Sequence, residues 1–240
     1  MYKSLFISDT HLGSSYGNSQ QLFDLLENIE VEQLFLVGDI INKSALKKHP
    51  DVVRFIELVK NKNWKIIYIA GNNEDDRLEP SAVTDSFIGE LLPKESYIYK
   101  RGQNSVYLEH GHSFHDKGKG NKLLCQGVIS LKWVLVQLRK MSKLKKSSSL
   151  NNGSVGVYKE SFYHRYIKPF AQKFLRHSFK EYMSTRTKEK DCSMVICGHF
   201  HIPEDSMVKG IRYLNCGDWV KNSSYVVENE DGDFLLIKEK

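Results

Sequence analysis

The chain has 240 residues, of which 40% are hydrophobic and 27% charged, a composition that predicts a globular protein and excludes a disordered tail or a collagen-like fibre. No apolar run reaches the ~18 to 20 residues that cross a bilayer, although contact with a membrane surface stays open. The four cysteines form no CxxC pair and no leader-like segment precedes the first predicted strand, so we expect a reducing, cytoplasmic location.

The first 110 residues alternate short apolar runs with helical patterns. A strand, helix, strand, helix, strand order with short connections predicts a parallel α/β sheet, whose loops at the carboxyl ends of the strands converge on one crevice. Strands are expected at 2–8, 33–37 and 64–70, and helices at 19–29, with Ser19 as N-cap, and at about 51–60.

Shorter strands are expected after residue 91, on both sides of a helical excursion. We therefore expect an α/β body at 1–116 and 191–240 with an inserted helical cap at 117–190. The later strands are predicted at 97–100, 105–109, 193–197, 212–216, 224–228 and 234–238, with a hairpin turn at Asp231-Gly232, and the cap helices at 122–141 and about 158–182.

Positive charge is concentrated in the cap. Residues 117–190 hold 18 Lys and Arg against three Glu, a net charge of +15, whereas the rest of the chain carries −9. A solvated surface is the plain interpretation of such a segment. The alternative is a surface that meets phosphate, nucleotide or anionic lipid, because a field of one sign concentrates a polyanionic ligand.

Side chains that bind metals follow five of the predicted strands. In Asp-x-His and His-x-His the side chains at i and i+2 lie on one side of an extended segment, so each pair can hold one ion or two adjacent ions. Oxygen and nitrogen donors without thiolate suit manganese, iron or zinc. The motifs are Asp9-x-His11, Gly38-Asp39, Gly71-Asn72, His110-Gly111-His112 and Gly198-His199-x-His201.

These five motifs, in this order, resemble those of the calcineurin-like metallophosphoesterases over roughly residues 4 to 218. The start at Ser8, the helical insert before Gly198 and the ending at 210–220 are most similar to the UDP-2,3-diacylglucosamine diphosphatase branch. The resemblance implies a four-layer α/β/β/α sandwich that holds two divalent ions, with manganese expected first and iron or zinc as alternatives.

The resemblance also implies a role for each motif residue. Asp39 would bridge the two ions, and the nucleophile would be a hydroxide shared by them and held at Asp39. The first ion would be bound by Asp9, His11 and His201, and the second by Asn72, His110 and His199.

Asn73 and His112 lie beside the predicted ligands in the sequence and are candidates for contact with the substrate or its leaving group. Many family members have His after the metal-binding Asn, where it assists the leaving oxygen, but this chain has Asn73. An amide cannot transfer a proton, so Asn73 favours a diphosphate substrate, whose leaving phosphate is a weak base. His112 is a candidate for handling substrate or protons, or a solvated loop histidine.

The resemblance to the diphosphatase branch implies the substrate: a phosphate-containing small molecule or lipid, most similar to UDP-2,3-diacylglucosamine, whose hydrolysis in lipid A biosynthesis would give UMP and a lipid sugar 1-phosphate. Peripheral contact with the inner membrane surface is expected through the basic cap. Two alternatives stay open: a nucleotide or nucleic-acid phosphodiesterase, encouraged by the basic cap, and a catalytically weak metal-binding scaffold, suggested by Asn73.

Overall fold

The computed structural model divides the chain into two compact units, one formed by Met1–His112 and Lys180–Lys240 and the other by Ser113–Phe179. The expected cap helix at 122–141, and residues 158–167 of the second one, lie outside the described residues. The division into body and cap therefore stays a prediction. The structure describes residues 2–14, 18–42, 49–75, 93–102, 104–116 and 168–239.

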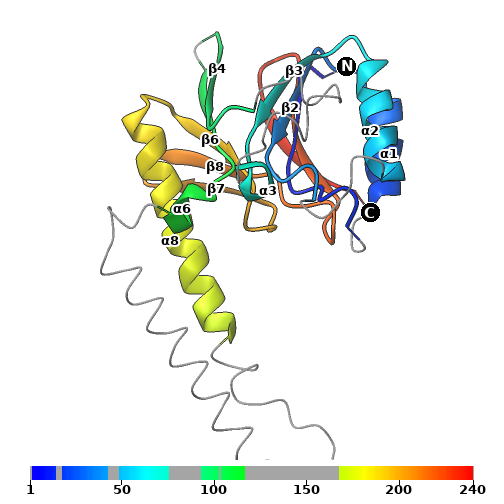
Figure 1. The fold of residues 1–240 in the computed structure, drawn as a ribbon. Coiled ribbons are helices and arrows are strands. Elements are labelled where there is room, and N and C mark those ends of the chain that lie inside the picture. Colours follow the sequence, from blue (N-terminus) through cyan, green and yellow to red (C-terminus); the bar gives the residue numbers. More distant parts are fainter. Residues whose placement is uncertain are drawn as a thin grey trace, which may run out of the picture. The chain divides into compact units, whose positions relative to one another are not determined.

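The first unit contains two mixed five-stranded sheets (Figure 1). In the first sheet, three parallel strands are extended by two antiparallel ones, in the order β10-β9-β1-β2-β3. Its strands are β1 (Ser4–Ile7), β2 (Gln33–Val37), β3 (Lys65–Ile69), β9 (Ser224–Glu228) and β10 (Phe234–Lys238).

The second sheet has the order β4-β5-β6-β8-β7, with β5, β6 and β8 parallel and the two outer strands antiparallel to their neighbours. Its strands are β4 (Tyr97–Arg101), β5 (Asn104–Leu108), β6 (Met194–Cys197), β7 (Glu204–Val208) and β8 (Ile211–Asn215).

Helices cover the outer faces of this pair of sheets (Figure 1). Helices α1 (Ser19–Asn28) and α2 (Pro50–Lys60) pack on the first sheet through buried side chains such as Leu22 and Phe55. The second sheet is covered by the end of α8 (Lys168–Glu189), from Lys180 onward. These layers confirm the predicted α/β/β/α sandwich.

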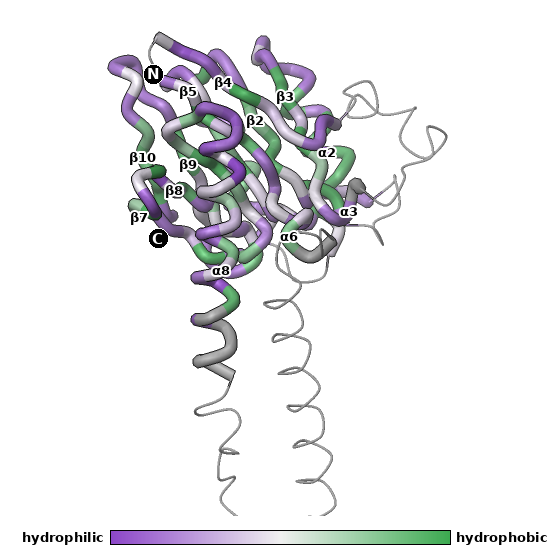
Figure 2. Tube along the Cα trace, turned by 90° about the vertical axis from the view of Figure 1, so that its left-hand side faces the viewer, coloured by the Kyte–Doolittle hydropathy of each residue, from purple (hydrophilic) through white to green (hydrophobic). Residues whose placement is uncertain are grey.

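The core between the sheets is apolar and aromatic. Phe6 of β1 and Phe35 of β2 are partners in the parallel register and stack with ring centroids 4.5 Å apart. Val106, Ile196 and other residues of the second sheet belong to the same buried cluster. Hydrophobic residues accordingly concentrate along the central strands, while hydrophilic residues dominate the connections (Figure 2).

Most predicted elements of the first unit are present within one or two residues of the expected bounds. Several details differ from the sequence analysis. The short helices at Asn72–Asp75 and Ser113–Asp116 were not predicted. The N-cap of α1 is Asn18, not Ser19, which is the first helical residue. Helix α8 continues to Glu189, seven residues beyond the expected end, and the edge strand β7 was not predicted. Among the described residues we find no helix that combines the length and the apolar character of a membrane span.

Candidate metal centre

The predicted ligands lie at the carboxyl ends of parallel strands in the two stacked sheets. Because parallel strands end at the same edge of a sheet, loops that are distant in sequence meet there. The structure brings together Asp9 and His11 after β1, Asp39 after β2, Asn72 at the start of α3 (Asn72–Asp75) after β3, His110 after β5, and His199 and His201 after β6.

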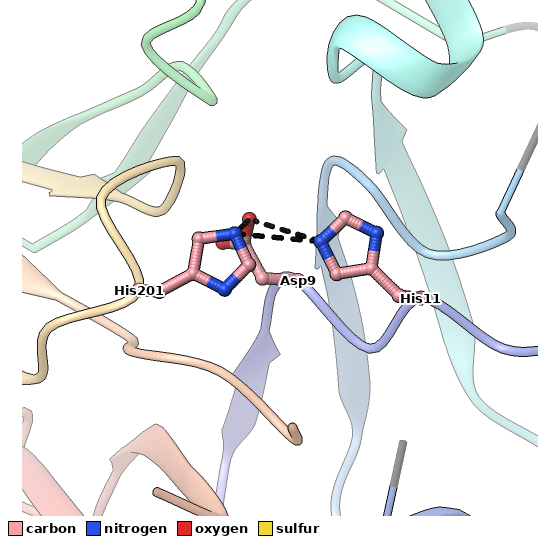
Figure 3. Close-up of side chains that lie close together, drawn as sticks. All are labelled: Asp9, His11 and His201. Carbon is pink, nitrogen blue, oxygen red and sulfur yellow. Dashed lines mark hydrogen bonds and ion pairs between the residues drawn. The ribbon is translucent and has the colours of Figure 1, made fainter. Parts of the chain in front are cut away.

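Asp9, His11 and His201 form the first cluster (Figure 3). Oδ1 of Asp9 lies 3.2 Å from Nε2 of His201 and 3.8 Å from Nε2 of His11, and the two Nε2 atoms are 3.4 Å apart. Ligand atoms ~2.1 Å from one ion at tetrahedral angles lie about 3.4 Å from each other. The three side chains therefore have the spacing of ligands to a single cation.

Asp39 connects this cluster to a second one. Its Oδ2 lies 3.8 Å from Nε2 of His11, while its Oδ1 lies 3.6 Å from Nε2 of His110. Asp9, Asp39 and His110 form the second group of potential ligands, so Asp9 belongs to both groups. A carboxylate whose two oxygens face different imidazoles has the arrangement that a bridging ligand needs.

Asn72 and His199 complete the side of the site that contains His110. Nδ1 of His199 lies 3.2 Å from Oδ1 of Asn72, and the rings of His199 and His110 meet edge to face with centroids 5.3 Å apart. These three residues are the ones that sequence similarity assigns to the second ion. Their assignment to that ion stays a proposal, which this proximity supports.

The loops that carry Asp9 and Asp39 remain hydrogen-bonded beyond the strands. Asp9 N donates to Gly38 O at 3.0 Å, and His11 N donates to Asp39 O at 3.0 Å. Backbone strain is concentrated here, because five of the eight non-glycine residues with positive φ in the described part of the chain are predicted ligands. They are Asp9 (51°), His11 (44°), Asp39 (52°), His199 (68°) and His201 (56°).

Two glycines allow these loops to approach each other. A Cβ atom at Gly38, whose φ is +82°, would lie 2.5 Å from the ring of His110. A Cβ atom at Gly198 would lie 1.9 Å from Oγ of Ser8 and 2.3 Å from Oδ2 of Asp9. Any side chain at either position would push ligands apart, so glycine is required at both.

Two buried atoms of the site lack a hydrogen-bond partner among the described residues: Oδ1 of Asp9 and Nε2 of His110. Burying an unpaired polar atom is costly unless something else binds it. Nδ1 of His110 donates to Val37 O at 2.8 Å, which leaves the lone pair on Nε2. Burial lowers the pKa of His110 to about 3, so this imidazole is neutral, the form that binds a cation. Both atoms fit a divalent ion.

Sequence reasoning missed Asp218, which follows β8 as Asp39 follows β2, in another Gly-Asp pair. Its Oδ2 lies 3.0 Å from Nδ1 of His201. Burial alone would raise the pKa of Asp218, but hydrogen bonds from His201 and from the loop outweigh this effect and lower the pKa to about 2. The carboxylate is therefore ionised. The repeated Gly-Asp pattern at a strand end was the available signal.

Glu109 is a second residue without a predicted role. The guanidinium of Arg186 on α8 donates to Glu109 Oε2 at 2.7 Å, and the hydroxyl of Tyr107 donates to the same oxygen at 2.6 Å. This buried network fixes the end of β5 immediately before His110. Nothing in the sequence indicated that Arg186, 77 residues away, would meet it.

Asn73 and His112 lie next to the clusters. The backbone N–H of Asn73 donates to Oδ1 of Asp39 at 2.8 Å, and its side-chain Nδ2 lies 3.3 Å from Nδ1 of His11. The half-buried ring of His112 lies 5.7 Å from that of His110, centroid to centroid. Their functions stay predictions.

Residues 2–203 match the family model of the calcineurin-like phosphoesterases, and the chain belongs to this family. The protein is accordingly a metal-dependent phosphoesterase. The family implies divalent metal ions, and the two Asp and His clusters could hold them. No curated protein matches the chain.

The solved structures that are similar to this chain have low sequence identity. Vps29 of Chaetomium thermophilum is 8% identical with a TM-score of 0.49, covering 100% of this chain and 96% of that one. A novel archaeal phosphodiesterase is 14% identical with a TM-score of 0.48 (98% and 99% covered), and the E. coli phosphoesterase YfcE is 13% identical with a TM-score of 0.45 (98% and 97% covered). Because all three TM-scores are below 0.5, these likenesses carry no conclusion about the fold or the activity of this chain.

Proposed function

We propose that this enzyme hydrolyses the diphosphate of a UDP-2,3-diacylglucosamine-type substrate, giving UMP and a lipid sugar 1-phosphate. One divalent ion would be held by Asp9, His11 and His201. The other would be held by Asn72, His110 and His199, and Asp39 would bind both ions. When bound, the ions supply Lewis-acid chemistry and lower the pKa of water. Manganese is the metal we propose, because nitrogen and oxygen donors without thiolate suit it.

The charges of the predicted ligands favour an anionic substrate. Asp9 and Asp39 contribute two negative charges, whereas the imidazoles and the amide of Asn72 are neutral in the forms that bind cations. Two divalent ions held by these groups would leave an excess of two positive charges. A phosphate or diphosphate group would therefore be attracted to the site.

The observation that carries the choice of a diphosphate is the position of Asn73. Its backbone N–H donates to Oδ1 of Asp39 and its Nδ2 lies 3.3 Å from Nδ1 of His11, next to the predicted ligands. This proximity supports the role that the family resemblance implies for the residue after the metal-binding Asn, which is to assist the leaving oxygen. Nδ2 can donate a hydrogen bond but cannot give up its proton. A phosphate leaving group needs no such proton, whereas an alkoxide does.

Two further features support a lipid substrate. The ending at 210–220, which resembles that of the diphosphatase branch, contains Asp218 and Trp219, and Trp219 N donates to Asp9 O at 3.2 Å. The net charge of +15 over 117–190 suits anionic headgroups, and we include peripheral membrane contact through this segment in the proposal. The residues of the segment up to 167 lie outside the described part.

The basic segment also favours a second candidate function, a nucleotide or nucleic-acid phosphodiesterase of the same family. Its field would attract a nucleic-acid backbone as well as a lipid headgroup. Phe162, Tyr163, Tyr166 and Phe170 recur at a helical spacing that is more typical of packing than of base stacking.

Hydrolysis assays with manganese separate these functions. We expect turnover of UDP-2,3-diacylglucosamine with release of UMP, and at most slow cleavage of short oligonucleotides. The reverse preference would overturn the lipid substrate in favour of the phosphodiesterase. A protein that binds manganese but cleaves neither substrate nor a generic aryl phosphodiester would instead be the metal-binding scaffold that Asn73 also suggests.

A further inference from the structure

The loop after β8 holds two of the predicted ligands of the first ion from outside the cluster. Trp219 N donates to the backbone carbonyl of Asp9, and Nδ2 of Asn222 donates to the carbonyl of His201 at 2.9 Å. The carboxylate of Asp218 meets the ring of His201 at Nδ1. His201 is thus held both at its strained backbone and at its ring by residues of one loop.

The orientation of the Asp218 carboxylate is determined by the loop itself. Oδ1 accepts hydrogen bonds from Lys221 N at 3.0 Å, Asn222 N at 2.9 Å and Asn222 Nδ2 at 3.0 Å. Oδ2 is therefore the oxygen that faces Nδ1 of His201, at 3.0 Å. Asp218 is only 2% exposed, so water has little access to these bonds.

The protonation state of the His201 ring follows from this arrangement. An ionised carboxylate can only accept, so Nδ1 of His201 must carry a proton. In the neutral imidazole the lone pair is then on Nε2, the atom that faces Asp9 and His11. A histidine that binds a metal through one nitrogen commonly donates from the other to a carboxylate.

We propose that Asp218 is a positioning residue that selects the Nδ1-protonated tautomer of His201 and thereby presents its Nε2 lone pair to the first ion. This inference rests on the proposed metal-binding role of His201. It goes beyond that role by assigning a task to a residue of the 210–220 segment that belongs to neither group of potential metal ligands.

The substitution Asp218→Asn gives a sharp test. The three N–H donors require an oxygen at the Oδ1 position, so the new amide must place its NH₂ group toward Nδ1 of His201. His201 would then have to accept at Nδ1 and carry its proton on Nε2, pointing at the ion site. A carboxylate-to-amide change beside a catalytic histidine acts in this way, through the tautomer and with little change in geometry.

The first measurement uses metal-free protein labelled with ¹⁵N, in alkaline buffer where the imidazoles are neutral. Long-range ¹H–¹⁵N spectra report which nitrogen of His201 carries the proton, and a His201→Gln variant assigns the signals. We expect protonated Nδ1 in the wild type and protonated Nε2 in Asp218→Asn. Protonated Nε2 in the wild type would overturn the proposal even if the variant failed to fold.

The second measurement is a manganese titration by calorimetry. Asp218→Asn should weaken one of two binding events by ~10- to 100-fold. Asp231 is exposed in the turn between β9 and β10. Asp231→Asn removes the same charge far from the proposed contact and is the matched control, which should leave both manganese-binding events unchanged. Unaltered tautomer and affinity in Asp218→Asn would refute the positioning role. Both readouts are independent of substrate, so failure to hydrolyse the UDP-linked lipid would overturn the proposed function without touching this inference.

Discussion

The Nε2 atoms of His11 and His201 lie 3.4 Å apart on rings that stack at an interplanar angle of 6°. Both atoms also face Oδ1 of Asp9, which has no hydrogen-bond partner among the described residues. Two parallel imidazoles pointing nitrogen at nitrogen stabilise each other poorly unless a shared cation or proton lies between them. The arrangement therefore predicts that folding and cation binding are coupled.

Chelation should lower the stability of the protein. An ion present at a hundredfold excess over its Kd stabilises the folded state by about 2.7 kcal/mol per site, which corresponds to roughly 5 to 10 °C in Tm for a chain of this size. Thermal unfolding with manganese and with EDTA measures the difference. The same comparison in Asp39→Ala should give a much smaller shift, and equal shifts in the two proteins would contradict binding at this site.

Asp39→Ala should abolish metal-dependent turnover. The two oxygens of Asp39 face His11 and His110 separately, so the substitution removes a carboxylate that faces residues of both clusters. Activity on an aryl phosphodiester and metal content are measured together, with exposed Asp231→Ala as the control. Near-normal activity with a full complement of metal would show that Asp39 is not a bridge.

The strands that deliver the predicted ligands could be predicted from sequence because each is a short apolar run followed by a glycine or a polar residue. β7 could not, because only alternate residues of its Glu-Asp-Ser-Met-Val sequence are partly buried and Met207 is 67% exposed. It forms as an edge strand through its pairing with β8, a partner that its own sequence does not indicate.

The candidate site likewise contains some residues that could be predicted from the sequence and others that could not. Asp9, Asp39 and the histidine motifs could be recognised because their residue types and order are specific. Asp218 was missed although its Gly-Asp pair repeats the one at Asp39, because such a pair after a strand is also an ordinary turn when no known motif contains it, and its partner His201 is 17 residues away. The contact of Arg186 with Glu109 depends on how α8 packs against the second sheet, which no local pattern encodes.

Metal binding should weaken as the pH falls below about 7. Burial raises the pKa of Asp9 from 3.8 to about 7 in the metal-free protein, with a smaller contribution from Asp39, so a proton competes with the ion for this carboxylate. Displacing one proton costs about tenfold in apparent affinity per pH unit below that pKa. Manganese titrations between about pH 6 and pH 8 measure the slope, and a constant affinity would contradict it.

The same pKa predicts how the stability of metal-free protein changes with pH. A carboxyl whose pKa is raised in the folded state contributes stability that is complete below about pH 4 and is lost as the pH rises through about 7. The amide in the Asp9→Asn variant cannot ionise, so the variant should not lose stability in this pH range for this reason. Relative to wild type, the free energy of unfolding of Asp9→Asn in urea with EDTA should therefore increase from about pH 4 to pH 7, whereas a difference independent of pH would argue against the raised pKa.

Neutralising Lys140, Lys143, Lys145 and Lys146 together should weaken association with anionic liposomes at low salt. These residues lie outside the described part of the structure, and the expectation comes from the charge of the segment alone. Attraction between exposed charges is screened beyond about 10 Å at 0.1 M salt. Cosedimentation at several salt concentrations measures it, and binding that is insensitive to salt would remove the electrostatic membrane contact.

Asn73→His should accelerate hydrolysis of substrates with poor leaving groups. An imidazole at this position can transfer a proton to a departing alkoxide, an advantage of ~10² or more, whereas the amide of Asn73 only donates a hydrogen bond. The rate for an alkyl phosphodiester should rise while the rate for a diphosphate changes little, because phosphate leaves without a proton. Asn73→Gln, which keeps an amide, is the matched control and should accelerate neither. An unchanged rate on the alkyl diester in a variant that keeps its metal would mean that protonation of the leaving group does not limit this enzyme, and the argument from Asn73 to a diphosphate substrate would fail with it.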